Sequence, residues 1–229
     1  FADVPGVVTK MRELVLEFAV TGRLSEYQSS DASISEFIEA LSNGKARFSK
    51  NGRRGNIPII QKEYLNIRPY NIPTHWAWVP LNKIGTISGG MTPSKDKSRF
   101  WNGDVNWFSS KDIKTNELTD AELKITREAV RATGLQVYPP GCLVMVARSG
   151  ILKRTFPVSI LRVEGTVNQD LKVLSPFVDG IERYLQIMLR GMTRYILTSL
   201  VKTGMTVQSL KYEEFETQVF PIPPLAEQK

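Results

Sequence analysis

The stretch Ser88–Lys114, SGGMTPSKDKSRFWNGDVNWFSSKDIK, decides how the rest of the sequence is interpreted. It opens with two glycines and a Thr-Pro turn, and it then alternates basic residues with large aromatic residues. Glycines allow a tight loop, and Pro93 stiffens the chain that follows. Such a loop can bind a phosphate backbone and its bases, but the pattern is equally typical of a solvated loop whose tryptophans pack into a core.

The composition favours an anionic partner. The chain has 229 residues, a formal net charge of +7 and a pI of about 9.5. This charge attracts nucleic acid or a membrane surface without specifying a chemistry. No apolar run approaches the roughly 20 residues of a membrane span. The single cysteine, Cys142, lies in an apolar run, so we expect a buried strand thiol in a reducing cytoplasm.

The N-terminal part of the chain predicts two helices followed by a basic connector. Apolar residues at helical spacing predict a helix over Val7–Val20 with one apolar face, which Gly22 ends. A capping box at Ser33 predicts a second helix, with Gly44 after its end. Residues 45–55 are basic and poor in apolar side chains, which indicates an exposed connector.

The rest of the chain predicts short strands and one long helix. Turn residues and apolar runs favour strands at 83–88, 104–108, 142–147, 157–163, 168–174 and 217–222, with turns at Asn102-Gly103 and Pro140-Gly141. Helical spacing predicts a helix over Ile181–Val201, which Asp179 caps and Gly191 bends, and a weaker one over Asp120–Ala132. Ser209 is a candidate cap for a further short helix.

Residues suited to catalysis are sparse. His75 is the single histidine, so the sequence offers neither a zinc cluster nor a Ser-His or Cys-His pair. Asp112, Glu122 and Lys124 weakly resemble a metal-dependent nuclease site, in which two carboxylates and a lysine hold Mg²⁺. The competing interpretation is a solvent-exposed helix with a structural role. The alternative function is therefore a fragment of a DNA-modifying enzyme, a nuclease or a methyltransferase, that works through these three residues.

Taken in order, several motifs resemble the DNA-specificity subunits of type I restriction–modification systems. The ending, with Pro-Pro-Leu-Ala-Glu-Gln at 223–228, is the most specific of them. The segment that opens with Trp76 is similar to the beginning of a target recognition domain in that family. The matching segments are Met11–Leu24, Trp76–Trp107, Val144–Gly150, Asn168–Gln169, the loop residues Gly204, Thr206 and Leu210, and Phe220–Gln228.

This resemblance implies an α+β fold. A mixed β-sheet is expected to form the target recognition domain, with flanking helices and an N-terminal amphipathic helix, and the chain is expected to end at the start of a long conserved spacer helix. The implied divisions are 1–24 for the N-terminal conserved helix, 25–57 for a helix and the basic connector, 58–220 for the target recognition domain, and 221–229 for the start of the central helix. Family members typically carry two such domains, so we expect a fragment or a half-subunit.

The resemblance also implies DNA recognition without catalysis in this chain. One recognition domain would read one half of a bipartite double-stranded DNA target in a bacterial or archaeal cytoplasm, as part of host defence. The helices would dock methyltransferase subunits, and restriction subunits would join for cleavage. S-adenosylmethionine, ATP and Mg²⁺ are expected on those partner subunits, and no cofactor is expected on this chain.

Candidate DNA-contacting residues lie on three predicted loops, because rigid strands can hold loop side chains against base edges. The loops are Thr92–Arg99, then Ser109–Lys111 with Arg148–Arg154 nearby, and finally Lys202–Gln208. Lysines and arginines are expected at phosphates, and polar side chains at base edges. The candidates are Thr92, Ser94, Lys95, Lys97, Arg99, Ser109, Ser110, Lys111, Arg148, Ser149, Lys153, Arg154, Lys202, Thr203, Thr206 and Gln208.

Trp76, Trp101 and Trp107 are assigned mainly to packing. Large aromatic side chains bury much apolar surface, and readout of a duplex rarely exposes a base for stacking. We therefore expect Trp101 and Trp107 to anchor the first loop to the sheet beneath it.

Overall fold

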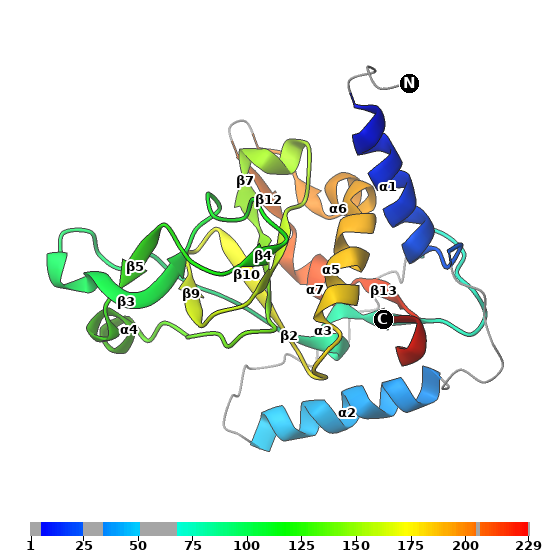
Figure 1. The fold of residues 1–229 in the computed structure, drawn as a ribbon, viewed down its shortest axis with the longest axis horizontal. Coiled ribbons are helices and arrows are strands. Elements are labelled where there is room, and N and C mark those ends of the chain that lie inside the picture. Colours follow the sequence, from blue (N-terminus) through cyan, green and yellow to red (C-terminus); the bar gives the residue numbers. More distant parts are fainter. Residues whose placement is uncertain (1–5, 25–33, 51–67, 205–206, 229) are drawn as a thin grey trace.

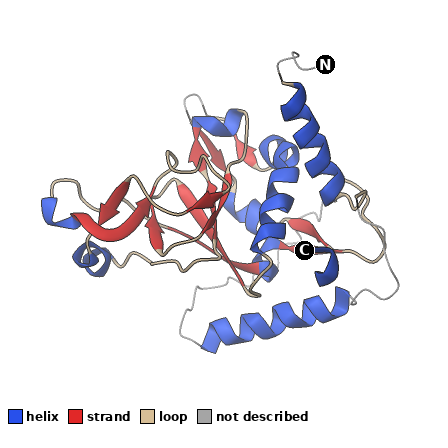
Figure 2. Ribbon diagram, viewed as in Figure 1, coloured by secondary structure: helices blue, strands red, loops and turns tan. Residues whose placement is uncertain are grey.

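The computed structural model describes residues 6–24, 34–50, 68–204 and 207–228. Within these ranges a β-rich body carries helices on one side, and a smaller lobe projects from the other side (Figures 1 and 2). Helices α1 (Val7–Val20) and α5 (Glu182–Gly191) pack against each other, and α2 (Ile34–Lys50) lies along the edge of the body.

A five-stranded mixed sheet forms the centre of the body, with the strand order β2-β10-β6-β8-β4. The pair β4 and β8 runs parallel, and the other neighbouring pairs of this sheet run antiparallel. Every residue of β6 and β8 is buried, which explains why the β6 sequence reads as one continuous apolar run. The strands are β2 (Gly85–Gly89), β4 (Glu117–Leu118), β6 (Leu143–Val146), β8 (Val158–Leu161) and β10 (Leu171–Pro176).

Three smaller sheets complete the described strands. One builds the lobe, together with the 3₁₀ turn η1 (Ser98–Phe100) and α4 (Arg127–Thr133); its strands are β5 (Leu123–Ile125), β3 (Trp101–Phe108) and β9 (Gly165–Val167). A second contains β11 (Val201–Lys202), β12 (Gln208–Leu210) and β7 (Arg148–Ser149). The third pairs β1 (Ala77–Pro80) with β13 (Val219–Ile222), so segments far apart in the sequence lie side by side.

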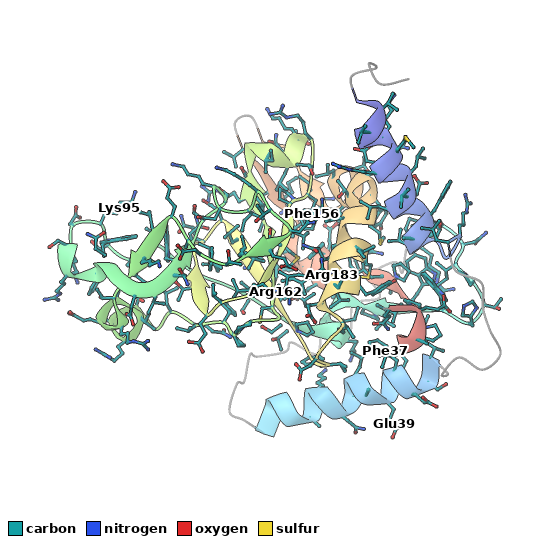
Figure 3. The ribbon with its side chains drawn as sticks, viewed as in Figure 1. Phe37, Glu39, Lys95, Phe156, Arg162 and Arg183 are labelled. Atoms are coloured by element: carbon teal, nitrogen blue, oxygen red, sulfur yellow. The ribbon has the colours of Figure 1, made fainter. Side chains whose placement is uncertain are left out.

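Two hydrophobic clusters hold these parts. The larger one fills the space between the five-stranded sheet, α5 and the short helices of the body, and the smaller one lies inside the lobe around Trp107 and Ile125. In Figure 3, Phe156 lies in the interior of the body. The remaining short elements are α3 (Leu81–Ile84), η2 (Gly150–Lys153), α6 (Thr193–Ser199), α7 (Tyr212–Thr217) and η3 (Leu225–Gln228).

Much of the expected secondary structure is confirmed. The α+β class, the mixed sheet and the N-terminal helix all appear, and Gly22 follows α1 with a left-handed φ of 69°. Cys142 is buried at the start of β6. The predicted helix over 181–201 divides into α5 and α6 directly after Gly191. A Cβ at Gly191 would lie 2.6 Å from Val20 Cγ1, so this glycine lets α1 approach α5 closely.

Two predictions about α2 are wrong. Gly44 lies inside the helix and does not end it. A Cβ at this position would collide with the carbonyl of Phe177. Glycine therefore serves a close approach at this position. Residues 45–50 belong to the helix, so the expected exposed connector does not begin at residue 45. The expected cap Ser33 and the other half of the connector, residues 51–55, lie outside the described residues.

The lobe also differs from expectation. Asn102 and Gly103 lie within β3, where the pairing with β5 shifts register, and they do not form a turn between strands. Asn102 has a φ of 61° there, which asparagine tolerates better than most residues. The region 120–132 holds β5 and then α4, so Glu122 and Lys124 do not lie on a helix. Thr126 caps α4 by accepting a hydrogen bond from Ala129 N.

Three smaller expectations also fail. Asp179 does not cap α5, whose first flanking residue is Ile181 with no side-chain cap. Ser209 belongs to β12 and does not cap α7. The expected strand over 83–88 begins at Gly85, because residues 81–84 form the helical turn α3.

Helix α1 leaves most of its apolar face exposed in the described part of the chain. Met11 is 60% exposed and Val15 is 54% exposed. The helix contacts α5 through its other side, where Leu16 and Val20 meet Gly191. None of the described helices combines the length and the apolar character needed to cross a membrane. The exposed residues of this face are Val7, Val8, Met11, Leu14, Val15 and Phe18.

Candidate nucleic-acid interface

The first loop, between β2 and η1, is held by two tryptophans. Trp107 donates its indole N–H to the carbonyl of Met91 at 3.0 Å, and Trp101 donates to the carbonyl of Ser94 at 3.1 Å. The two rings meet edge to face, with centroids 5.3 Å apart. Trp107 is buried and Trp101 is half-buried. The prediction that both tryptophans anchor this loop is confirmed.

The start of the same loop rests on β9 and on the turn after it. A Cβ at Gly90 would collide with the carbonyl of Val167, so glycine allows the loop to lie directly against the strand. Two residues later, Thr92 Oγ1 donates a hydrogen bond of 2.7 Å to Oε1 of Gln169. The loop therefore leaves the sheet from a fixed position.

The tip of the first loop is exposed and basic. Lys95 projects from the lobe, on the side away from α2 in Figure 3. Lys97 lies over the ring of Phe100, with Nζ 5.2 Å from the ring centroid. Arg99 is less available, because its Nε lies 3.0 Å from Glu128 Oε1, although both side chains remain about half exposed or more. Such exposed ion pairs are weak, so a DNA phosphate can compete for Arg99.

The second loop is stiffened by Asp112. Ser109 donates to Asp112 Oδ2 from both its backbone N and its hydroxyl, each at 2.8 Å. The Ser109 hydroxyl also accepts a hydrogen bond from Lys111 N. Ser110 is half-buried and Lys111 is exposed. The hydroxyl of Ser109 is thus committed within the loop, which leaves Lys111 as its accessible cation.

The third loop is flanked by β11 and β12, and the small sheet β11-β12-β7 joins it to the segment Arg148–Ser149. Arg148 pairs with Ser209, and Ser209 pairs with Lys202. Residues directly opposite in neighbouring strands project from the same face of a sheet. Arg148, Ser209 and Lys202 therefore form a cross-strand row in which a hydroxyl lies between two exposed cations. In Figure 1, β7 and β12 lie on the side of the molecule opposite α2.

The turn Asn168–Asp170, which we call the hub turn, contacts the first loop, the end of β3 before the second loop, and β7, whose sheet carries the third loop. Gln169 holds Thr92 of the first loop. The backbone N of Asn168 donates to the carbonyl of Phe108, directly before the second loop, at 2.9 Å. The carbonyl of Asp170 accepts from Arg148 N at 3.1 Å, and its Oδ1 lies 3.6 Å from Arg148 Nε. The hub turn therefore links the regions that carry the three sequence-predicted loops.

Individual candidates differ in accessibility. Gln208 is 4% exposed and donates from Nε2 to the carbonyl of Gly204, so it holds the third loop from inside. Thr203 is exposed and Ser149 is half-buried, whereas Thr206 lies outside the described residues. Within those residues, no carboxylate lies at salt-bridge distance from the exposed cations Lys95, Lys97, Lys111, Lys153, Arg154 and Lys202.

Other basic residues are already neutralised. Arg162 and Arg183 both donate to Oε1 of Glu117, at 2.8 and 2.9 Å. The hydrogen bond from Arg162 holds the pKa of the Glu117 carboxyl below its usual range. Figure 3 places both arginines near α5, away from the lobe tip that carries Lys95. Arg162 and Arg183 are therefore less available to an anionic ligand than the exposed cations of the loops.

Two of the three residues of the alternative catalytic site, Asp112 and Lys124, are held in other contacts. Both carboxylate oxygens of Asp112 accept backbone hydrogen bonds, Oδ2 from Ser109 and Oδ1 from Glu122 N at 3.0 Å. Lys124 pairs with Asp120 at 2.9 Å and lies on β5. In the described part of the chain, no three acidic, histidine or cysteine side chains gather as metal ligands would.

The family described as the type I restriction modification DNA specificity domain matches residues 73–229, which include all three loops and the hub turn. The chain belongs to this family. A relative is the specificity subunit of the Escherichia coli type I restriction enzyme EcoR124I/EcoR124II, which is 34% identical over 153 residues, covering 66% of this chain and 38% of that protein. The MjaIX specificity subunit of Methanocaldococcus jannaschii is 27% identical over 161 residues, or 69% of this chain and 36% of that protein.

Solved specificity-subunit structures share the fold. The HsdS subunit from Thermoanaerobacter tengcongensis superposes with a TM-score of 0.50 at 16% identity, over 98% of this chain and 49% of that one. A chain from a structural study of complex assembly and conformational transition in the type I R-M system gives a TM-score of 0.53 at 15% identity, over 96% and 47%. This specificity domain therefore spans less than half the length of each of these relatives.

Proposed function

We propose that this chain reads one half of a bipartite double-stranded DNA target as a specificity subunit of a type I restriction–modification complex. The observation that carries the proposal is that the hub turn contacts the first loop, the strand end before the second loop and the sheet that carries the third loop, inside the segment that matches the DNA specificity domain family. Loops fixed to a rigid sheet are suited to hold side chains against base edges.

The geometry suggests how contacts are divided. The cross-strand row Arg148, Ser209 and Lys202 offers two cations and a hydroxyl on one face, which suits a phosphate group. Lys95 and Lys97 at the tip of the first loop suit phosphates further along the duplex. Base readout then falls to the polar residues near the hub turn, where backbone hydrogen bonds hold the chain.

Two candidates take supporting roles in this proposal. Gln208 is buried and holds the third loop through the carbonyl of Gly204. Ser109 fixes the second loop through Asp112. We keep Thr203, Lys111, Lys153 and Arg154 as DNA contacts because they are exposed on the same loops. Ser209 joins the contact set, although the sequence pattern alone placed it at a helix cap.

We also propose that α1 docks a partner protein. Its exposed apolar residues, with Met11 and Val15 at the centre, form the kind of surface that marks protein interactions. A methyltransferase subunit is the expected occupant, and restriction subunits would join the assembled complex. S-adenosylmethionine, ATP and Mg²⁺ would then act on those subunits, while this chain contributes recognition and no catalysis. Such a complex would work in the cytoplasm, where chromosomal DNA lies.

The test is a selection from a pool of random duplexes with the purified chain. Binding at low salt followed by sequencing is expected to enrich one short motif, since a single recognition domain contacts few base pairs. Enrichment of no motif, with equal retention of all duplexes, would contradict the proposal.

Two further arms exclude the enzymatic alternative. The chain is incubated with DNA and Mg²⁺, and separately with DNA and S-adenosylmethionine. We expect neither cleavage nor methylation. Activity in either arm that is lost in the Asp112→Asn and Glu122→Gln variants would instead support a catalytic fragment.

A further inference from the structure

Gln169 is the exposed residue of the hub turn, and none of the sequence motifs assigned it a role in DNA contact. It lies between Asn168, which fixes the end of β3, and Asp170, which contacts Arg148. Hydrogen bonds to other segments of the chain therefore hold the backbone on both sides of Gln169.

The amide of Gln169 is oriented before any ligand arrives. Its Oε1 accepts a hydrogen bond of 2.7 Å from Thr92 Oγ1. A carbonyl oxygen has two lone pairs, so Oε1 can accept a second hydrogen bond. Among the described residues, the Nε2 group donates to no partner, which leaves two N–H donors for a ligand. Fixing a long polar side chain in advance reduces the entropy lost when it binds.

The available donor and acceptor match one base edge. In the major groove, adenine presents the N7 acceptor and the N6 amino donor, and a glutamine amide binds both at once. Phosphates accept hydrogen bonds but donate none, so a phosphate would use the Nε2 group alone. The neighbouring cations Arg148 and Lys202 already suit phosphates, which favours a base edge for Gln169.

We propose that Gln169 is a specificity-determining residue that reads an adenine in the major groove, and that Thr92 is the positioning residue that sets its amide. This inference rests on the proposed function, because it requires the hub turn to face a DNA duplex. It changes the role of Thr92: its hydroxyl acts through Gln169 and does not itself contact a base.

The experiment repeats the random-duplex selection with five variants of the chain, one of them a control, and with the unaltered protein. Gln169→Ala removes the amide, and Gln169→Glu replaces the donor group with a second acceptor. Thr92→Val removes the hydroxyl at nearly constant volume, and Thr92→Ser restores it. The matched control is Gln136→Ala, which truncates another exposed glutamine, located between α4 and β6.

We expect Gln169→Ala to lose the adenine preference at one position of the motif while the other positions persist. A bidentate contact of this kind gives about 5- to 150-fold discrimination. Gln169→Glu is expected to favour cytosine at that position, because a carboxylate accepts from the cytosine N4 amino group. Thr92→Val is expected to weaken the same preference, Thr92→Ser to retain it, and Gln136→Ala to change nothing.

The outcomes separate this inference from the proposed function. A motif that is identical for the unaltered protein, Gln169→Ala and Gln169→Glu would overturn the role of Gln169 and leave DNA recognition standing. Loss of the whole motif in Gln169→Ala, with unchanged thermal unfolding, would assign Gln169 to overall affinity and would also overturn base readout. If the unaltered protein enriches no motif, the proposed function itself is wrong.

Discussion

The indole N–H of Trp76 donates a hydrogen bond of 3.0 Å to Oε2 of Glu227, although the two residues are 151 positions apart in the sequence. His75 Nε2 lies 2.7 Å from Oε1 of the same carboxylate, and the Glu227 side chain is 6% exposed. Together with the β1–β13 pairing, this contact fixes the end of the described chain to the beginning of the domain.

Glu227→Ala is therefore expected to destabilise the fold. The variant leaves the buried Trp76 indole without this acceptor, at a cost of about 1–3 kcal/mol in the free energy of unfolding. Glu227→Gln keeps an oxygen acceptor and should lose less. Urea unfolding followed by circular dichroism measures both, and an unchanged midpoint for Glu227→Ala would show that the contact contributes nothing.

Gly90→Ala should displace the first loop. Its new methyl group would collide with the carbonyl of Val167, which belongs to a strand and cannot move aside cheaply. We expect a loss of about 1–3 kcal/mol in stability and a weakened DNA affinity. Gly89→Ala is the matched control, because its nearest neighbour is the Lys172 ammonium at 3.2 Å, the far end of a flexible side chain. Equal effects for both variants would contradict the proposed close packing of the first loop against β9.

The cross-strand row predicts a change in salt dependence. Lys202→Ala is expected to reduce the slope of log affinity against log salt by about one, as for the loss of one phosphate contact. Arg148→Ala should weaken DNA binding more than Arg99→Ala, since Arg99 lies 3.0 Å from Glu128 whereas Arg148 lies farther, at 3.6 Å, from Asp170. Titrations at several salt concentrations measure both quantities. Unchanged affinity and an unchanged slope for Lys202→Ala and Arg148→Ala would show that the cross-strand row does not contact DNA.

Lys172 predicts a pH-dependent gain in stability. Burial lowers the pKa of this ammonium from its ordinary value of 10.5, although Nζ lies 4.4 Å from the centroid of the Tyr212 ring. The unfolded chain thus binds this proton more tightly, and the charge destabilises the fold below the lowered pKa. Lys172→Met should raise the free energy of unfolding near neutral pH, and this gain should shrink as the pH approaches 10.5.

Urea unfolding near neutral pH and near pH 10.5 tests this prediction, with the exposed Lys114→Met as the control. A Lys172→Met variant that is less stable than the unaltered protein near neutral pH would show that the contact with Tyr212 outweighs the burial of the charge.

The exposed face of α1 predicts a separation of two functions. The double variant Met11→Glu, Val15→Glu places charges on residues that contact solvent, so unfolding and DNA affinity should stay within about 0.5 kcal/mol of the original values. Co-purification with a methyltransferase subunit should be lost. Retained co-purification would show that this face does not bind the methyltransferase subunit. Lost DNA binding would show that α1 supports the recognition loops.

The sequence predicted the loop and its anchors because their chemistry is local. The spacing of Trp101 and Trp107 and the paired glycines before Pro93 indicated an anchored loop, and the hydrogen bonds to Met91 and Ser94 confirm it. The long apolar run into β6 and the helical spacing of α1 were equally clear. In each case the residues involved lie close together in the sequence, as Trp107 and Met91 do at a separation of 16.

The hub turn could not be predicted because it depends on contacts between distant residues. Thr92 and Gln169 are 77 residues apart, and the row that places Ser209 beside Arg148 depends on strand register. Gly44 shows the same limitation. Its local preference predicts a helix end, but it lies inside α2, where glycine is needed because the carbonyl of Phe177 packs against it. Local patterns identify elements, and tertiary contacts decide which of their residues share a face.

The most direct test of the account is a competition measurement between the selected motif and a scrambled duplex of equal composition. Recognition through the hub turn predicts that the chain prefers the motif by at least about tenfold, and that Gln169→Ala and Arg148→Ala both reduce this ratio. An equal affinity for both duplexes, falling with salt to the same extent, would show non-specific attraction by a positively charged surface and would contradict the central claim.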